Sequence, residues 1–159
     1  MRLGLECPTK LLEMVQPFAD FGFLLAHKVL EDEEYKAYWK DFDGFKVLDN
    51  SVNEKGEPLS IDKLEEASTA VGCKVIVAPD YIGDAGKTIE SYVECVRKFG
   101  KENVWGVLQG RDIKEALGCL RYIEGVVCIP YDIGSSKEDP PWLMGLRRTI
   151  AVLSIPTDR

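Results

Sequence analysis

The sequence predicts an α/β fold in which short buried strands alternate with amphipathic helices. Five segments of four to six residues are almost continuously apolar, which is typical of strands whose two faces are both covered. The segments between them repeat apolar residues at helical spacing, and such alternation favours right-handed βαβ units and a parallel sheet. A chain of 159 residues has the size of one domain, so we predict a single (β/α) domain over residues 1–159.

The predicted strands follow one another at regular intervals. They are Phe21–Ala26, Phe45–Leu48, Lys74–Ala78, Asn103–Leu108 and Val126–Ile129. Five βα units are too few for a closed TIM barrel, which needs eight and typically ~250 residues. Two architectures stay open: a TIM-barrel-like but incomplete barrel, which we favour, and a complete five-stranded doubly wound domain.

Capping residues mark the predicted helices between the strands. A short helix is expected over Thr9–Val15, and Ser60 precedes a helical pattern as its N-cap. The long apolar stripe that follows the third strand ends at Gly100, and the next helix follows Asp112. Asp139 and Pro140 open a last predicted helix, with aspartate as the cap and proline in the first turn.

Composition excludes several classes of protein. Lys+Arg 20 against Asp+Glu 27 gives a net charge of -7, which disfavours a broad nucleic-acid surface but leaves a narrow site open. No apolar run of ~18 residues predicts a membrane span, and the N-terminus lacks the apolar core of a signal peptide. The five cysteines never form C-x-x-C spacing, so we expect no zinc site and reduced thiols in a cytoplasmic protein.

Polar side chains follow every predicted strand. His27, Asp49, Asp80, Gln109 and Asp132 come after the five strands in turn. Parallel α/β folds bind ligands at the carboxyl ends of their strands. Carboxylates there can act as general acid, base or nucleophile, and a glutamine offers both a donor and an acceptor to the edge of a heterocycle.

A single aspartate after a strand more often caps a helix or forms a turn than performs chemistry. Asp84, Asp112 and Asp139 fit that structural role, because each precedes a helical pattern. Asp49 and Asp80 fit it less well, because no helix is predicted to follow at once. These two aspartates are therefore the better candidates for a functional site.

Three other conspicuous groups favour a structural interpretation. His27 has no second histidine with which to bind a metal, and residues 31–34 form an acidic, solvated helix start. Aromatic side chains at helical spacing predict a packing face: Tyr35, Tyr38, Trp39 and Phe42. Residues 83–88 (GDAGKT) only partly imitate a phosphate-binding loop, and neither G-x-G-x-x-G nor G-x-S-x-G occurs.

Four strand-end motifs, in this order, resemble the tRNA-guanine transglycosylase (queuine tRNA-ribosyltransferase) superfamily. The resemblance is to its shorter phage-type and bacterial branch, associated with insertion of 7-deazaguanine into nucleic acid. The motifs are Leu48–Ser51 (LDNS), Ala78–Asp84 (APDYIGD), Val107–Gly110 (VLQG) and Ile129–Gly134 (IPYDIG). Phe21–Glu31 and Asp49–Leu59 resemble that branch too, and the similarity covers roughly residues 3–148.

The resemblance implies a TIM barrel that replaces guanine with a 7-deazaguanine in tRNA or DNA without breaking the sugar–phosphate backbone. It implies that Asp49 is a general acid/base near the exchanged base. It implies that Asp80 binds the amino and ring N–H edge of the base, and that Gln109, with Gly110 beside it, recognises the base as well. This prediction requires Asp49, Asp80 and Gln109 to converge on one purine-sized hollow.

The same resemblance implies that Gly134 and Ser135 close the base pocket after the fifth strand. The chain departs from the family at Asn50 and Ser51, which replace the usual Gly-containing sequence and make positive φ less accessible. The covalent aspartate and the zinc-binding cysteines of the family have no counterpart in this sequence. We therefore expect the chain to carry the base-recognition part, with no zinc or other cofactor.

Two other hypotheses stay open. The first is a small doubly wound domain that binds a ligand or protein without catalysis, although His27 and Lys28 stand where a receiver-type module would carry an acidic cluster. The second is a split protein that functions on joining its missing C-terminal half or a second copy, because an incomplete barrel has an open sheet edge. Size-exclusion chromatography would separate a compact monomer from an oligomer.

Overall fold

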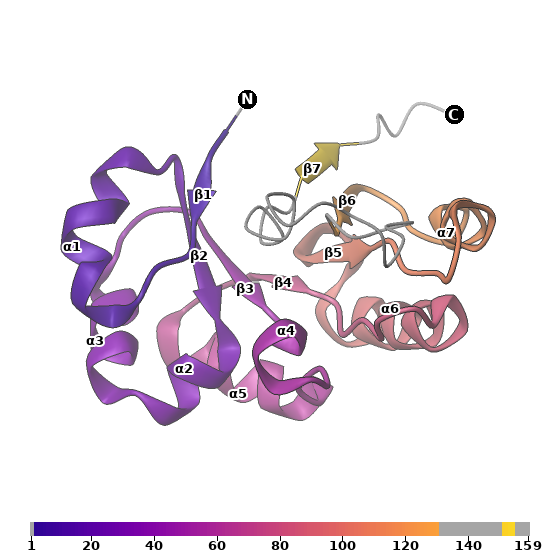
Figure 1. Ribbon diagram of the computed structural model, residues 1–159. Helices are drawn as coiled ribbons and strands as arrows, with labels where there is room; N and C mark the ends of the chain where they lie inside the picture. Colours follow the sequence, from indigo (N-terminus) through magenta and orange to yellow (C-terminus); the bar gives the residue numbers. More distant parts are fainter. Residues whose placement is uncertain (1, 131–150, 155–159) are drawn as a thin grey trace. The chain divides into compact units, whose positions relative to one another are not determined.

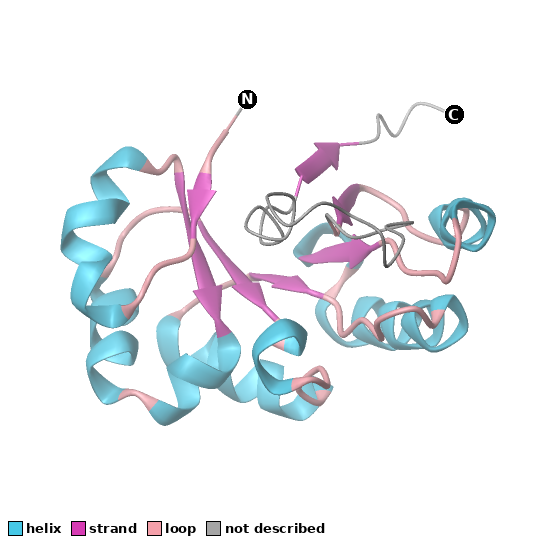
Figure 2. Cartoon of the chain, viewed as in Figure 1, coloured by secondary structure: helices cyan, strands magenta, loops and turns pink. Residues whose placement is uncertain are grey.

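The computed structural model describes residues 2–130 and 151–154 (Figure 1). The chain divides into two compact units, Met1–Val77 and Ala78–Arg159, and each is described by itself. Both units contain helices and strands, which Figure 2 separates by colour, so the predicted α/β class is confirmed. None of the helices that the structure describes has the length and apolarity needed to cross a membrane.

The first unit is built on four parallel strands that lie side by side in chain order. They are β1 (Gly4–Leu5), β2 (Phe21–Leu25), β3 (Lys46–Asp49) and β4 (Val75–Val77). The predicted strands match β2, β3 and β4 to within one residue at each end. β1 was not predicted, because two residues carry no periodic pattern.

Helices of the first unit occupy the connections between these strands. They are η1 (Thr9–Leu11), α1 (Leu12–Val15), η2 (Gln16–Phe18), α2 (Ala26–Glu31), α3 (Glu33–Asp41), α4 (Val52–Lys55) and α5 (Ile61–Val71). The predicted short helix at residues 9–15 is thus part 3₁₀ and part α-helix. The expectation that no helix follows Asp49 closely was wrong, because α4 begins at Val52.

The second unit contains α6 (Ala85–Phe99), η3 (Lys101–Asn103), β5 (Val104–Val107), α7 (Ile113–Leu120), β6 (Val126–Ile129) and β7 (Ala151–Ser154). β5 and β6 are parallel, as predicted, whereas β7 pairs with β6 in the antiparallel sense. The sequence pattern had indicated parallel strands only. The helix predicted to begin at Asp139 lies outside the described residues.

Strand register decides which face of the first sheet each side chain occupies. Gly22 pairs with Lys46, and Leu25 pairs with Asp49. A Cβ on Gly22 would overlap the ring of Trp39, so the helices cover the Gly22 face. Side chains alternate along a strand, so Leu25 and Asp49 lie on the opposite face. Asp49 is therefore at the carboxyl end of β3, on the sheet face away from α3.

Buried polar contacts tie the helices to this sheet. The Tyr35 hydroxyl on α3 accepts a hydrogen bond from Leu25 N at 3.0 Å. Lys46 Nζ on β3 donates to three backbone oxygens, those of Trp39 (3.0 Å), Phe42 (3.0 Å) and Val71 (2.8 Å). Lys46 thus satisfies carbonyl groups at the carboxyl ends of α3 and α5. A positive charge is also favourable there, because the carboxyl end of a helix carries the negative end of the helix dipole.

The predicted helix boundaries are confirmed by their caps. Ser60 accepts from Lys63 N, Asp84 from Lys87 N and Asp112 from Glu115 N, at 3.4, 3.0 and 2.8 Å. Gly100 ends α6 with φ 84°, a conformation that glycine adopts without strain. The predicted aromatic packing face is confirmed too, since Tyr35 and Trp39 are fully buried.

Candidate functional site

Asp80 and Gln109 form a buried side-chain pair in the second unit. Asp80 follows the segment in which Ala78 N donates to Trp105 O of β5 at 2.9 Å, and Gln109 lies two residues beyond the end of β5. Their side chains are 4% and 5% exposed. Gln109 Nε2 donates to Asp80 Oδ2 at 2.6 Å. The structure therefore brings together two of the three side chains that the sequence singled out.

The loop after Asp80 is held at both sides. Gly83 N donates to Gln109 Oε1 at 3.1 Å. Tyr81 N donates to Thr88 Oγ1 at 2.9 Å, and Thr88 Oγ1 donates to Asp84 O at 2.8 Å. Thr88 is buried on α6, and the sequence had offered it only as part of the imperfect GKT run. Gln109, the hydrogen-bond partner of Gly83, lies 26 residues further along the chain, so sequence patterns did not reveal this contact.

Two ionisable side chains lie on the helices of the second unit, Cys119 on α7 and Lys87 on α6. Burial raises the pKa of the Cys119 thiol on α7, and the negative charge of Asp80 raises it further. Cys119 therefore stays a neutral thiol at neutral pH. Lys87 is exposed on α6; its Nζ lies 5.6 Å from the ring centre of Tyr81 and 3.9 Å from Oδ2 of Asp84, with which it forms an ion pair.

Gly110, predicted to lie beside the bound base, has a packing reason of its own. A Cβ there would lie 2.7 Å from Ala116 N and 2.8 Å from Glu115 Cβ, so only glycine allows α7 to come this close. The next residue, Arg111, forms an exposed ion pair with Glu115, Nη2 to Oε1 at 2.5 Å. This contact lowers the pKa of Glu115 to about 2. The charge of Arg111 is therefore already compensated.

Asp49 belongs to the first unit and is described with its own neighbours. It is 7% exposed, and Asn50 and Ser51 are fully buried. Asp49 Oδ2 accepts from Ser51 N at 2.8 Å, and Asn50 Oδ1 accepts from Val52 N at 3.0 Å. Each side chain thus bonds the backbone two residues later, the pattern of an Asx turn. This turn leads from β3 into α4, so Asp49 has the turn-forming role that the sequence analysis had ranked lower.

Ser51 holds a left-handed backbone conformation, with φ 65°. It is the one positive-φ residue other than glycine in the described part of the chain, and such a conformation costs a serine roughly 1–2 kcal/mol. Its hydroxyl accepts from His27 N, in the first turn of α2, at 3.2 Å. Ser51 thus adopts the positive φ that was predicted to be less accessible here than to glycine, and its hydroxyl joins the Asp49 turn to α2.

His27 follows the end of β2 by two residues, as predicted, and lies in the first turn of α2. Its Nδ1 atom is buried without a hydrogen-bond partner. Partial burial is the main cause that lowers the pKa of the imidazole, and the positive charge of Lys55 lowers it further. The side chain is therefore neutral at neutral pH, in agreement with the packed role that the sequence analysis favoured.

Three of the predicted strand-end and pocket residues lie in the C-terminal part of the chain. Gly134 and Ser135 lie outside the described residues, as does Asp132. Within the described ranges, no three His, Cys, Asp or Glu side chains are grouped so that they could hold a metal ion. A surface hollow of about 540 Å³ on the first unit, bordered by Thr9, Tyr38 and Phe42 among others, contains none of the predicted site residues.

No protein-family model matches the chain, and neither a curated protein nor a solved structure matches it. The resemblance to tRNA-guanine transglycosylases thus stays a prediction from the four motifs. The geometry adds the buried Asp80–Gln109 pair and the Asp49 turn.

Proposed function

We propose that this chain is the base-recognition part of a base-exchange transglycosylase, which replaces guanine with a 7-deazaguanine in tRNA or DNA. The single observation that carries the proposal is the buried Asp80–Gln109 pair. The parallel strands of the two units, joined by helices, are compatible with part of a (β/α) barrel. An incomplete TIM-barrel-like architecture remains our proposal for the whole chain.

The chemistry of the pair suits a guanine edge. Guanine and 7-deazaguanine present a ring N–H and an amino group side by side, and an ionised carboxylate accepts from both. A carboxylate has about four acceptor positions, so the bond from Gln109 does not exhaust the capacity of Asp80. Adenine presents an acceptor where guanine has its ring N–H, so the same carboxylate rejects it.

Asp49 would serve as the proton-transfer group. Proton transfer by a positioned carboxyl typically contributes 10²–10⁴-fold to a rate. Base exchange also needs a carboxylate that stabilises the oxocarbenium-like centre at the sugar. We assign that carboxylate to no described residue. The proposal therefore covers recognition of the base, and extends to turnover only if another polypeptide supplies the covalent group.

Titration calorimetry on the purified chain tests base recognition. We expect guanine and 7-deazaguanine to bind and adenine to bind roughly 100-fold more weakly or not at all. Asp80→Asn should lose guanine binding, because the amide replaces one acceptor oxygen with a donor. Asp112→Asn is the matched control, since asparagine caps a helix as well as aspartate does. Equal guanine affinity in the wild type and Asp80→Asn would refute the proposal.

Exchange activity and assembly need separate assays. Incorporation of radiolabelled guanine into tRNA and into double-stranded DNA identifies the acceptor, if the chain or its complex turns over. Binding of guanine without incorporation by the chain alone agrees with the proposal, whereas no incorporation by its complex either would favour the non-catalytic alternative, a ligand-binding α/β domain. Size-exclusion chromatography of the same sample shows whether the chain is a monomer or a homo-oligomer. We propose a cytoplasmic location and no resident cofactor.

A further inference from the structure

Both polar atoms of the Gln109 carboxamide are used within the second unit. Nε2 donates to Asp80 Oδ2 at 2.6 Å, and Oε1 accepts from Gly83 N at 3.1 Å. The side chain is 5% exposed, so water competes little for either atom. One glutamine therefore links a buried carboxylate to the backbone of the loop that follows that carboxylate.

The orientation of this carboxamide follows from its partners. A backbone N–H can only donate, so the atom that faces Gly83 N must be the oxygen Oε1. The NH₂ group then necessarily faces Asp80, which accepts. The reverse orientation would place two donors together at Gly83 and two oxygens together at Asp80. Both bonds thus specify the same rotamer, and each supports the other.

The loop needs this support on the side of β5. Its other side is fixed to α6, where Tyr81 N donates to Thr88 Oγ1. Gly83 has φ 74°, in the left-handed region that glycine adopts without strain, and its N–H has its hydrogen-bond partner outside the loop. Gln109 supplies that partner from the end of β5.

We propose that Gln109 is a positioning residue, which orients the Asp80 carboxylate and holds the Gly83 loop, instead of acting mainly as a base-contacting group. That the oriented carboxylate serves base binding rests on the proposed function. The link among Gln109, Asp80 and Gly83 can be tested without any ligand. The resemblance alone had assigned Gln109 to direct recognition of the base.

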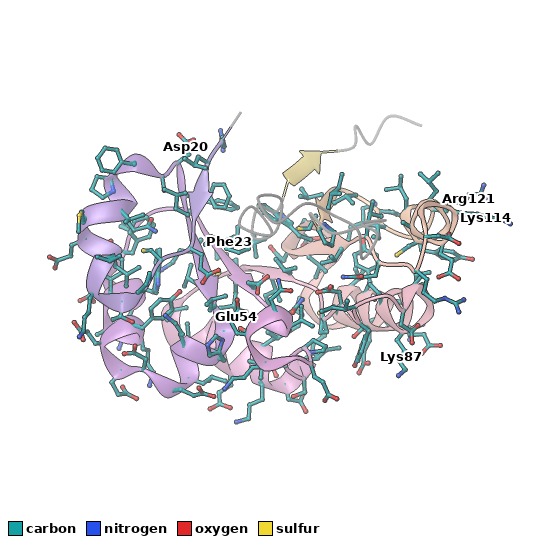
Figure 3. The ribbon with its side chains drawn as sticks, in the orientation of Figure 1. Asp20, Phe23, Glu54, Lys87, Lys114 and Arg121 are labelled. Atoms are coloured by element: carbon teal, nitrogen blue, oxygen red, sulfur yellow. The ribbon has the colours of Figure 1, made fainter. Side chains whose placement is uncertain are left out.

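Two substitutions separate the contact of Gln109 with Asp80 from its contact with Gly83. Gln109→Glu keeps an acceptor for Gly83 N but places a carboxylate against Asp80, so the two groups must share a proton. Gln109→Met keeps the length and the unbranched shape and removes both bonds. Lys114→Gln, on the exposed side of α7, is the control (Figure 3). The nearby ionisable group Cys119 stays neutral through the range of the titration, because its pKa is raised.

NMR on the isotopically labelled full chain measures both contacts of Gln109: amide exchange reports the bond to Gly83, and titration of the carboxyl group reports the bond to Asp80. In Gln109→Met we expect exchange of the Gly83 amide proton to accelerate roughly tenfold or more, since one hydrogen bond is lost. In Gln109→Glu that exchange should stay within about threefold of the wild type. The titration midpoint of the Asp80 carboxyl, followed by ¹³C, should move upward by roughly one to two pH units in both variants. Lys114→Gln should change neither quantity.

Unchanged Gly83 exchange and an unchanged Asp80 midpoint in Gln109→Met would overturn the proposal. If Gln109→Met does not fold, an unchanged Asp80 midpoint in Gln109→Glu overturns it equally. Guanine calorimetry on the same samples separates this inference from the proposed function. Altered exchange and titration in a wild-type background that binds no guanine would support the positioning role and refute base recognition. Guanine binding by the wild type, with unchanged Gly83 exchange and Asp80 titration in the Gln109 variants, would support base recognition and refute the positioning role.

Discussion

The strand-end aspartates of the two units are both buried, but they are held in different ways. Asp49 accepts from the backbone of Ser51, two residues further along the chain. Asp80 accepts from the side chain of Gln109, 29 residues away. The first contact is part of a local turn, whereas the second exists only when β5 is folded beside the Asp80 segment. The Asp49 carboxylate is thus placed by local backbone conformation, and the Asp80 carboxylate by tertiary structure.

The two aspartates also have different proposed roles, so we predict that they affect base binding unequally. Asp80→Ala should weaken guanine binding by roughly 100-fold or more, because two charge-assisted hydrogen bonds from the base are lost. Asp49→Ala should change the guanine affinity by less than about threefold, since its proposed role is proton transfer. Isothermal titration calorimetry measures both affinities. A larger loss in Asp49→Ala than in Asp80→Ala would reverse the assignment of the two residues.

The second prediction concerns the stability of the Asp49 turn. Asp49→Ala leaves the buried N–H of Ser51 without its acceptor and should lower the free energy of unfolding by about 1–3 kcal/mol. Asp49→Asn keeps an acceptor oxygen and should cost less than about 1 kcal/mol. Urea unfolding followed by circular dichroism gives both values. Equal losses in the two variants would show that the carboxylate charge matters more than the turn.

How much of this could be predicted from the sequence depends on how local each interaction is. Ser60, Asp84 and Asp112 were recognised as caps because a cap and its helix are adjacent in the chain. The bond between Gly83 N and Gln109 Oε1 spans 26 residues, and no spacing rule connects them. The four-residue α4 carries too short a pattern to be detected, so the turn-forming role of Asp49 was underestimated.

The left-handed conformation of Ser51 in the first unit predicts a difference in stability between two substitutions. Ser51→Gly relieves the cost of the left-handed conformation but loses the hydrogen bond from His27 N. Ser51→Ala loses that bond and keeps the strain. Ser51→Ala should therefore be less stable than Ser51→Gly by about 1 kcal/mol in urea unfolding. Equal stability of the two variants would mean that φ at this position is not left-handed in solution.

The smallest expected effect is a pH dependence from His27. Burial lowers the pKa of this imidazole in the folded chain below its ordinary value of about 6.5. As the pH falls below about 6.5, the unfolded state binds the proton first, so stability is lost from there down to the folded pKa. His27→Gln should remove this slope between pH 7 and 5 in urea unfolding. A wild type that becomes more stable as the pH falls over that range would contradict the lowered pKa of the partly buried His27.

Chemical-shift mapping with guanine tests the central claim most directly. On addition of guanine to the ¹⁵N-labelled chain, we predict the largest shift changes at the Gly83 amide, the Asp80 amide and the side-chain NH₂ of Gln109. Adenine at the same concentration should leave these signals in place. Changes centred instead on the hollow near Tyr38 and Phe42, or no change with guanine at all, would contradict the assignment of the Asp80–Gln109 pair as a base-binding site.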